Sequence, residues 1–117
     1  MFQNLRAISY DWHMELQGIS NAQHMVLREL CSQHEVERLE LFGSAARGDF
    51  DPKSSDLDFL VLFRKEGKLN AADRFLGLLA AMEDLFGRKI DLVDVSAARN
   101  PYFMAEALKH RVKLYAA

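Results

Sequence analysis

The sequence predicts a small α/β fold with the element order helix, helix, strand, strand, helix, strand, helix. Residues 58–63 are almost continuously apolar and rich in strand formers, which is typical of an internal strand covered on both faces. Residues 70–87 repeat apolar side chains at helical spacing, and residues 89–95 alternate as a strand does. With 117 residues, 50% of them hydrophobic, we expect one domain over residues 1–117 with a modest core.

The N-terminal part of the chain is expected to be helical. Residues 1–18 form an extension with apolar side chains at near-helical spacing, at Leu5, Ile8, Trp12 and Leu16. A second helix is predicted after Ser20, because Ser20 and Gln23 have the spacing of a capping box. The first strand follows, beginning at Val36 and ending at Phe42-Gly43.

The later elements have clear boundary signals. Asn70 can cap the helix that follows it, and Gly87 is placed to end that helix. Asn100-Pro101 predicts the start of the last helix, because a capping residue precedes a proline at the first helical position. Residues 112–114 predict a terminal extended segment.

Composition limits the classes of function. The formal net charge of -2 and the pI of about 6.1 argue against a basic surface, so we expect no direct nucleic-acid binding. The single Cys31 cannot form an internal disulfide, which favours a reducing compartment. No apolar run reaches membrane-spanning length and the N-terminus is not like a secretory signal. We therefore expect a cytoplasmic protein without a membrane partner.

The most informative stretch is residues 41–63, where a glycine-serine turn precedes an Asp-x-Asp pair. Alternation in a strand would point Asp56 and Asp58 the same way, and two such close carboxylates repel each other. Oxygen-rich clusters of this kind suit Mg²⁺ held together with substrate phosphates, although a solvated pair at a strand end is an equally good interpretation of Asp-x-Asp alone. Gly43 permits close backbone approach, and Ser44 offers an amide and a hydroxyl to a phosphate oxygen.

A third carboxylate, Asp91, favours the metal interpretation. Asp91 lies on a separate predicted strand, and if that strand neighbours the one with Asp58, three carboxylates converge in a two-metal centre. Arg47 and Lys53 are candidate phosphate partners, with solvated loop charges as the alternative. Ser55 is a further candidate for nucleotide binding, although its first expected role is to tighten the loop.

These motifs resemble the signature of the polymerase-beta-like nucleotidyltransferase superfamily. The resemblance rests on two motifs, Gly43-Ser44-Ala45-Ala46-Arg47-Gly48 and Ser55-Asp56-Leu57-Asp58. More narrowly, residues 20–115 are similar to the minimal nucleotidyltransferases, which are often encoded beside a HEPN-domain partner. One departure is Ala45, which stands where an arginine is common, so that Arg47 would carry more of the phosphate binding.

The resemblance implies a small mixed sheet flanked by helices, with Gly43 and Ser44 at the triphosphate. It implies that Asp56, Asp58 and Asp91 ligate two Mg²⁺ ions, and that Asp91 also activates the attacking hydroxyl. Paired family members act as antitoxins that transfer AMP from ATP to a tyrosine hydroxyl of a HEPN ribonuclease toxin. The implied assembly is a hetero-oligomer with that toxin.

Three other functions remain alternatives at this point. A nucleotidyltransferase acting on a small molecule such as an aminoglycoside would need an acceptor pocket, for which the chain is short. A template-directed polymerase or an RNA-tailing enzyme is disfavoured by the acidic balance of charge. A non-catalytic antitoxin that neutralises by binding would not require three intact carboxylates.

Overall fold

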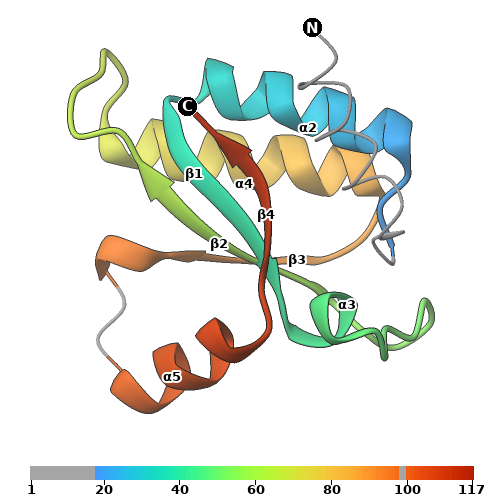
Figure 1. Ribbon diagram of the computed structural model, residues 1–117. Coiled ribbons are helices and arrows are strands. Elements are labelled where there is room, and N and C mark those ends of the chain that lie inside the picture. The colour runs from blue at the N-terminus through green and yellow to red at the C-terminus, as the bar shows by residue number, and fades with distance from the viewer. Residues whose placement is uncertain (1–17, 98–99) are drawn as a thin grey trace, which may run out of the picture.

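The computed structural model describes residues 18–97 and 100–117, and the predicted N-terminal helix lies outside them. The described chain forms one four-stranded sheet in the order β3-β2-β1-β4 (Figure 1). The strands are β1 (Val36–Phe42), β2 (Leu57–Phe63), β3 (Ile90–Asp94) and β4 (Val112–Ala116). β1 pairs antiparallel with β2 and β4, whereas β2 and β3 are parallel. The predicted mixed sheet is confirmed.

Helices cover the sheet on both faces. α2 (Asn21–Gln33) and α4 (Ala71–Phe86) lie together on one face, and α5 (Pro101–Lys109) lies on the other (Figure 1). The short helix α3 (Gly43–Arg47) follows β1 directly, and a 3-10 turn, η1 (Val95–Ala97), follows β3. In the described ranges, no helix combines the length and apolar character needed to cross a membrane.

The predicted helix boundaries are confirmed by their hydrogen bonds. The amide of Gln23 donates to Ser20 Oγ over 3.1 Å, and the amide of Ser20 donates to Gln23 Oε1 over 2.9 Å, which completes the capping box. The amide of Asp73 donates to Asn70 Oδ1 over 2.8 Å at the start of α4. Gly87 ends α4 in the left-handed conformation, with φ of 63°.

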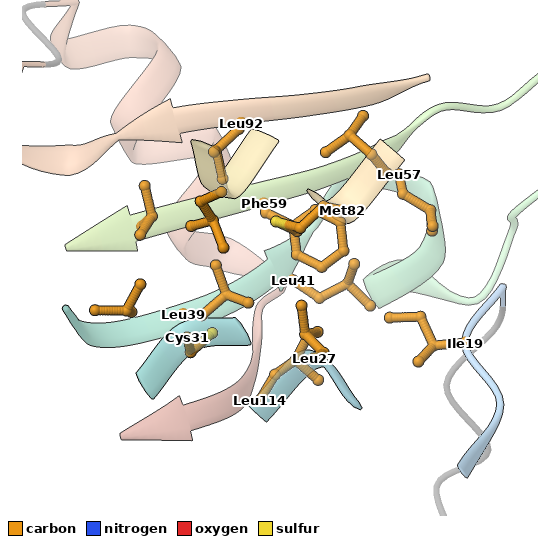
Figure 2. Close-up of a cluster of buried hydrophobic side chains, with 14 of the residues drawn as sticks. Ile19, Leu27, Cys31, Leu39, Leu41, Leu57, Phe59, Met82, Leu92 and Leu114 are labelled. Atoms are coloured by element: carbon orange, nitrogen blue, oxygen red, sulfur yellow. The ribbon is translucent and has the colours of Figure 1, made fainter. Parts of the chain in front are cut away.

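The main core lies between the sheet and the α2–α4 layer. Alternate residues of the strands point into it, and Figure 2 shows Leu41 of β1 and Phe59 of β2 facing Leu27 of α2 and Met82 of α4. The intervening residues point to the α5 face, where Phe42, Leu60 and Ala107 form a second, smaller cluster. This alternation decides which face of the sheet carries the polar residues of β2 and β3.

Two elements go beyond the predicted order. α3 occupies the segment after Gly43 that was expected to be a turn and loop, and five residues are too few to show a helical period. The extended segment near the C-terminus is a full strand, because β4 completes its hydrogen bonds on the free edge of β1.

Candidate active site

The turn at Gly43 lies directly against Asp58. β1 and β2 place Phe42 opposite Asp58, and the next residue, Gly43, has φ of +72°. A Cβ atom added to Gly43 would overlap the carboxylate of Asp58. The position therefore requires glycine for two reasons, a left-handed backbone and close approach to an acidic side chain. The two halves of the predicted motif are in contact.

Asp58 and Asp91 are neighbours on the α5 face of the sheet. The parallel register of β2 and β3 pairs them directly. Burial, the charges of Asp91 and Asp56, and a hydrogen bond to Asp91 together raise the pKa of Asp58 to about 6, with burial as the largest cause. The structure thus brings together the second and third carboxylates that were predicted to converge.

Asp56 approaches the pair from the loop before β2. It precedes the strand by one residue, so strand alternation alone does not orient it. Its side chain is 45% exposed, and Oδ2 lies 3.9 Å from Lys89 Nζ. Because the charge of Asp56 acts on the pKa of Asp58, Asp56 belongs to the same electrostatic cluster.

The predicted phosphate-binding residues occupy α3 and the loop after it. The N-cap residue of α3, Phe42, makes no side-chain cap hydrogen bond to the helix that carries Ser44. Arg47 is half exposed and lies 3.6 Å from Asp49 through its Nε atom. Its positive charge lowers the pKa of Asp58, so Arg47 is close enough to the carboxylates to interact with them electrostatically.

Ser55 and Lys53 are engaged inside the loop in the described structure. The amide of Asp51 donates to Ser55 Oγ over 3.0 Å, and the amide of Lys53 donates to Asp51 Oδ1 over 2.9 Å. The hydroxyl of Ser55 thus tightens the loop, which is the first role expected for it. The exposed side chain of Lys53 extends from the same turn.

Sequence reasoning missed two residues beside the site, Arg88 and Lys89. Lys89 approaches Asp56, and Arg88 donates to backbone carbonyl groups of the loop that carries Asp56. The available signal was a pair of basic residues immediately before the strand with Asp91. That signal becomes informative only once the loop is known to fold back against this strand.

The donor set fits Mg²⁺ in the presence of phosphate. Among residues 18–97 and 100–117, no three acidic, histidine or cysteine side chains already surround a common metal position. Mg²⁺ does not need such a cage, since it commonly takes one or two carboxylates together with substrate phosphates and water. Burial and the neighbouring carboxylates Asp91 and Asp56 raise the pKa of Asp58, and a bound cation would offset both effects.

This fold and this carboxylate cluster define a small nucleotidyltransferase. The nucleotidyltransferase domain family matches residues 24–114, and the chain belongs to that family. A protein of Methanocaldococcus jannaschii, named provisionally as a protein adenylyltransferase, is 31% identical over 88 residues, covering 75% of this chain and 83% of the relative. A second protein of that organism with the same provisional name is 34% identical over 88 residues, with the same coverage.

Solved structures agree on the fold. One described provisionally as a minimal nucleotidyltransferase has a TM-score of 0.64 and 30% identity, covering 78% of this chain and 88% of its own. A toxin–antitoxin complex with AMP-PNP contributes a chain with a TM-score of 0.62 and 21% identity, covering 84% of this chain and 75% of its own. A complex of a tri-AMPylated Shewanella oneidensis HEPN toxin with an MNT antitoxin contributes a chain with a TM-score of 0.58 and 17% identity. The match covers 82% of this chain and 71% of that chain.

Proposed function

We propose that this protein is an antitoxin that transfers AMP from ATP, with Mg²⁺, to a tyrosine hydroxyl of a HEPN ribonuclease toxin. The observation that carries the proposal is the contact between the Gly43 turn and the paired carboxylates Asp58 and Asp91. A triphosphate site and a metal site are then adjacent, as transfer of a nucleotide requires. The relatives named as protein adenylyltransferases support a protein acceptor, and the toxin–antitoxin complexes share the fold.

Each residue has a stated role in the proposed reaction. Asp56, Asp58 and Asp91 would hold Mg²⁺, two ions in the full complex, and bound Mg²⁺ would neutralise charge on the triphosphate and the leaving pyrophosphate. The amide and hydroxyl of Ser44 donate to a phosphate oxygen, which Gly43 allows to approach the backbone. Arg47 offers a further positive charge on the same helix.

Asp91 acts on the acceptor. Its carboxylate takes the proton of the tyrosine hydroxyl as that oxygen forms a bond to the α-phosphorus of ATP. The bond from the α-phosphorus to the bridging oxygen breaks, and pyrophosphate leaves with the electron pair. The exposed position of Asp91 on the α5 face leaves it accessible to an acceptor supplied by another protein.

The decisive experiment measures whether label from the α-phosphate of ATP is transferred to a protein. The protein is incubated with Mg²⁺, a HEPN-domain protein from the same genome and ATP labelled at the α-phosphate, with γ-labelled ATP as a matched control. We expect label on the HEPN protein from the α-position only, and none when its acceptor tyrosine is replaced by phenylalanine. The double variant Asp56→Asn/Asp58→Asn should transfer nothing.

Other outcomes identify the alternatives. If no label is transferred and the double variant still neutralises the toxin, the protein is a non-catalytic antitoxin and the proposal is wrong. If the label passes to an aminoglycoside and not to the HEPN protein, the acceptor is a small molecule. Transfer from γ-labelled ATP would mean phosphoryl rather than nucleotidyl transfer.

A further inference from the structure

The loop that carries Asp56 is folded around a second aspartate, Asp51. The amides of Ser54 and Ser55 donate to the carbonyl oxygen of Asp51 over 3.2 Å and 2.8 Å. The hydroxyl of Ser54 donates to Asp51 Oδ2 over 2.9 Å, and the amide of Asp51 donates to Ser55 Oγ. These bonds give the loop a shape, but they all lie within it and do not fix its position on the protein.

Arg88 ties this loop to the rest of the molecule. Its two terminal nitrogens reach two different carbonyl groups, with Nη1 donating to Ser55 O over 3.3 Å and Nη2 donating to Pro52 O over 3.1 Å. The guanidinium group also lies over the ring of Phe50, 4.9 Å from the ring centre. Arg88 thus holds the loop at its beginning, its middle and the residue directly before Asp56.

The position of Arg88 in the chain connects two carboxylates. Arg88 follows Gly87, the left-handed cap of α4, and precedes β3, which carries Asp91 three residues later. The adjacent Lys89 approaches Asp56 over 3.9 Å. One arginine therefore links the segment that places Asp56 to the segment that places Asp91.

We propose that Arg88 is a positioning residue. By donating hydrogen bonds to the carbonyl groups of Pro52 and Ser55, it fixes the position of Asp56 relative to Asp58 and Asp91. This inference rests on the proposed function, because it assigns Asp56 to the metal–nucleotide site. Lysine cannot perform this role, since a point charge cannot span two carbonyl groups and stack on a ring at once. Arg88 touches no reacting atom and acts only through the loop.

The test compares Arg88→Ala and Arg88→Lys with Arg28→Ala, which removes an exposed arginine of α2, outside the loop and outside β3. The first measurement is amide hydrogen exchange of the metal-free protein. We expect exchange at Ser54 and Ser55 to be about 10-fold faster in both Arg88 variants, with β1 and β2 unchanged, because the loop opens locally. The Arg28→Ala variant should exchange like the wild type.

The second measurement is binding of Mn²⁺ in the presence of AMP-PNP, followed by electron paramagnetic resonance. We expect both Arg88 variants to bind Mn²⁺ about 10- to 100-fold more weakly, as is common when a group that orients metal ligands is removed. Full affinity in Arg88→Lys would show that charge alone suffices and would overturn the inference. Faster exchange with unchanged Mn²⁺ affinity would do the same, because the arginine would then be merely structural.

The two proposals fail in different ways. If the wild type binds no Mn²⁺ with AMP-PNP, the proposed function falls and the inference falls with it. If the wild type binds and the Arg88 variants bind equally well, only the role of Arg88 is refuted.

Discussion

Replacing Asp58 by asparagine should stabilise the metal-free protein at neutral pH. The folded pKa of Asp58 is raised from 3.8 to about 6, so the folded protein holds a proton that the unfolded chain releases between these values. Ionisation of Asp58 therefore opposes folding. The stability that the protonated carboxyl contributes is fully present below pH 3.8 and is lost as the pH rises through about 6. Asparagine has the same shape, carries no charge and removes this opposition.

The size of the effect follows from the shift. Two pH units correspond to about 3 kcal/mol, and solvent screening of a partly buried group reduces this to about 1 kcal/mol in the free energy of unfolding. For a domain of this size, that change raises the midpoint of thermal unfolding by about 4 °C. Below about pH 3 the difference between variant and wild type should vanish, because Asp58 is then protonated in both the folded and unfolded states.

Differential scanning calorimetry of the metal-free protein over about pH 3 to 8 measures this difference directly. Asp84→Asn is the matched control, because it removes an exposed carboxylate of α4, a helix on the opposite face of the sheet from Asp58 and Asp91. The reasoning is refuted if Asp58→Asn is less stable than the wild type at pH 7.5. It is also refuted if the difference is independent of pH, since electrostatic repulsion could not then be its cause.

Two further predictions concern backbone and burial. Gly43→Ala should lower the free energy of unfolding by about 1–2 kcal/mol in urea titrations and abolish nucleotide transfer, because it combines left-handed strain with a clash against Asp58. Gly48→Ala has comparable strain at φ of 91° and open space around it, so it should lose stability but retain transfer; equal loss of transfer in both would contradict the steric argument. Burial raises the pKa of the Cys31 thiol to about 12, so the native protein should resist thiol reagents at pH 8 until it unfolds, and rapid labelling would contradict this.

The sequence was most informative where a local period determines structure. Strand alternation predicted that Ile90 and Leu92 face one way and Asp91 the other, and the burial of the first two confirms it. Capping signals at Ser20 and Asn70 predicted helix starts to the residue. Both signals depend on bonds between residues close in sequence, so they do not require knowledge of the fold.

The parts that were predicted incompletely depend on contacts between distant segments. Residues 112–114 were expected to be extended, but their pairing with the free edge of β1 to form β4 could not be inferred from five residues of sequence. Arg88 gains its contacts because the loop after α3 returns to the start of β3. The side-by-side placement of Asp58 and Asp91 was a conditional prediction for the same reason, and only the parallel register of β2 and β3 fulfils the condition.

Burial and the nearby carboxylates together disfavour the ionised form of Asp58 in the free protein, and the same surroundings suit a cation. Asp58 lies against the Gly43 turn on one side and pairs with Asp91 of the neighbouring strand on the other. In the free protein this environment favours the protonated form of Asp58, as its raised pKa of about 6 indicates. In the proposed complex, a divalent ion that arrives with a triphosphate would offset this charge better than a proton, because it would neutralise several oxygens at once. The raised pKa of Asp58 in the free protein and the proposed affinity for a metal–nucleotide complex would therefore be two consequences of one arrangement.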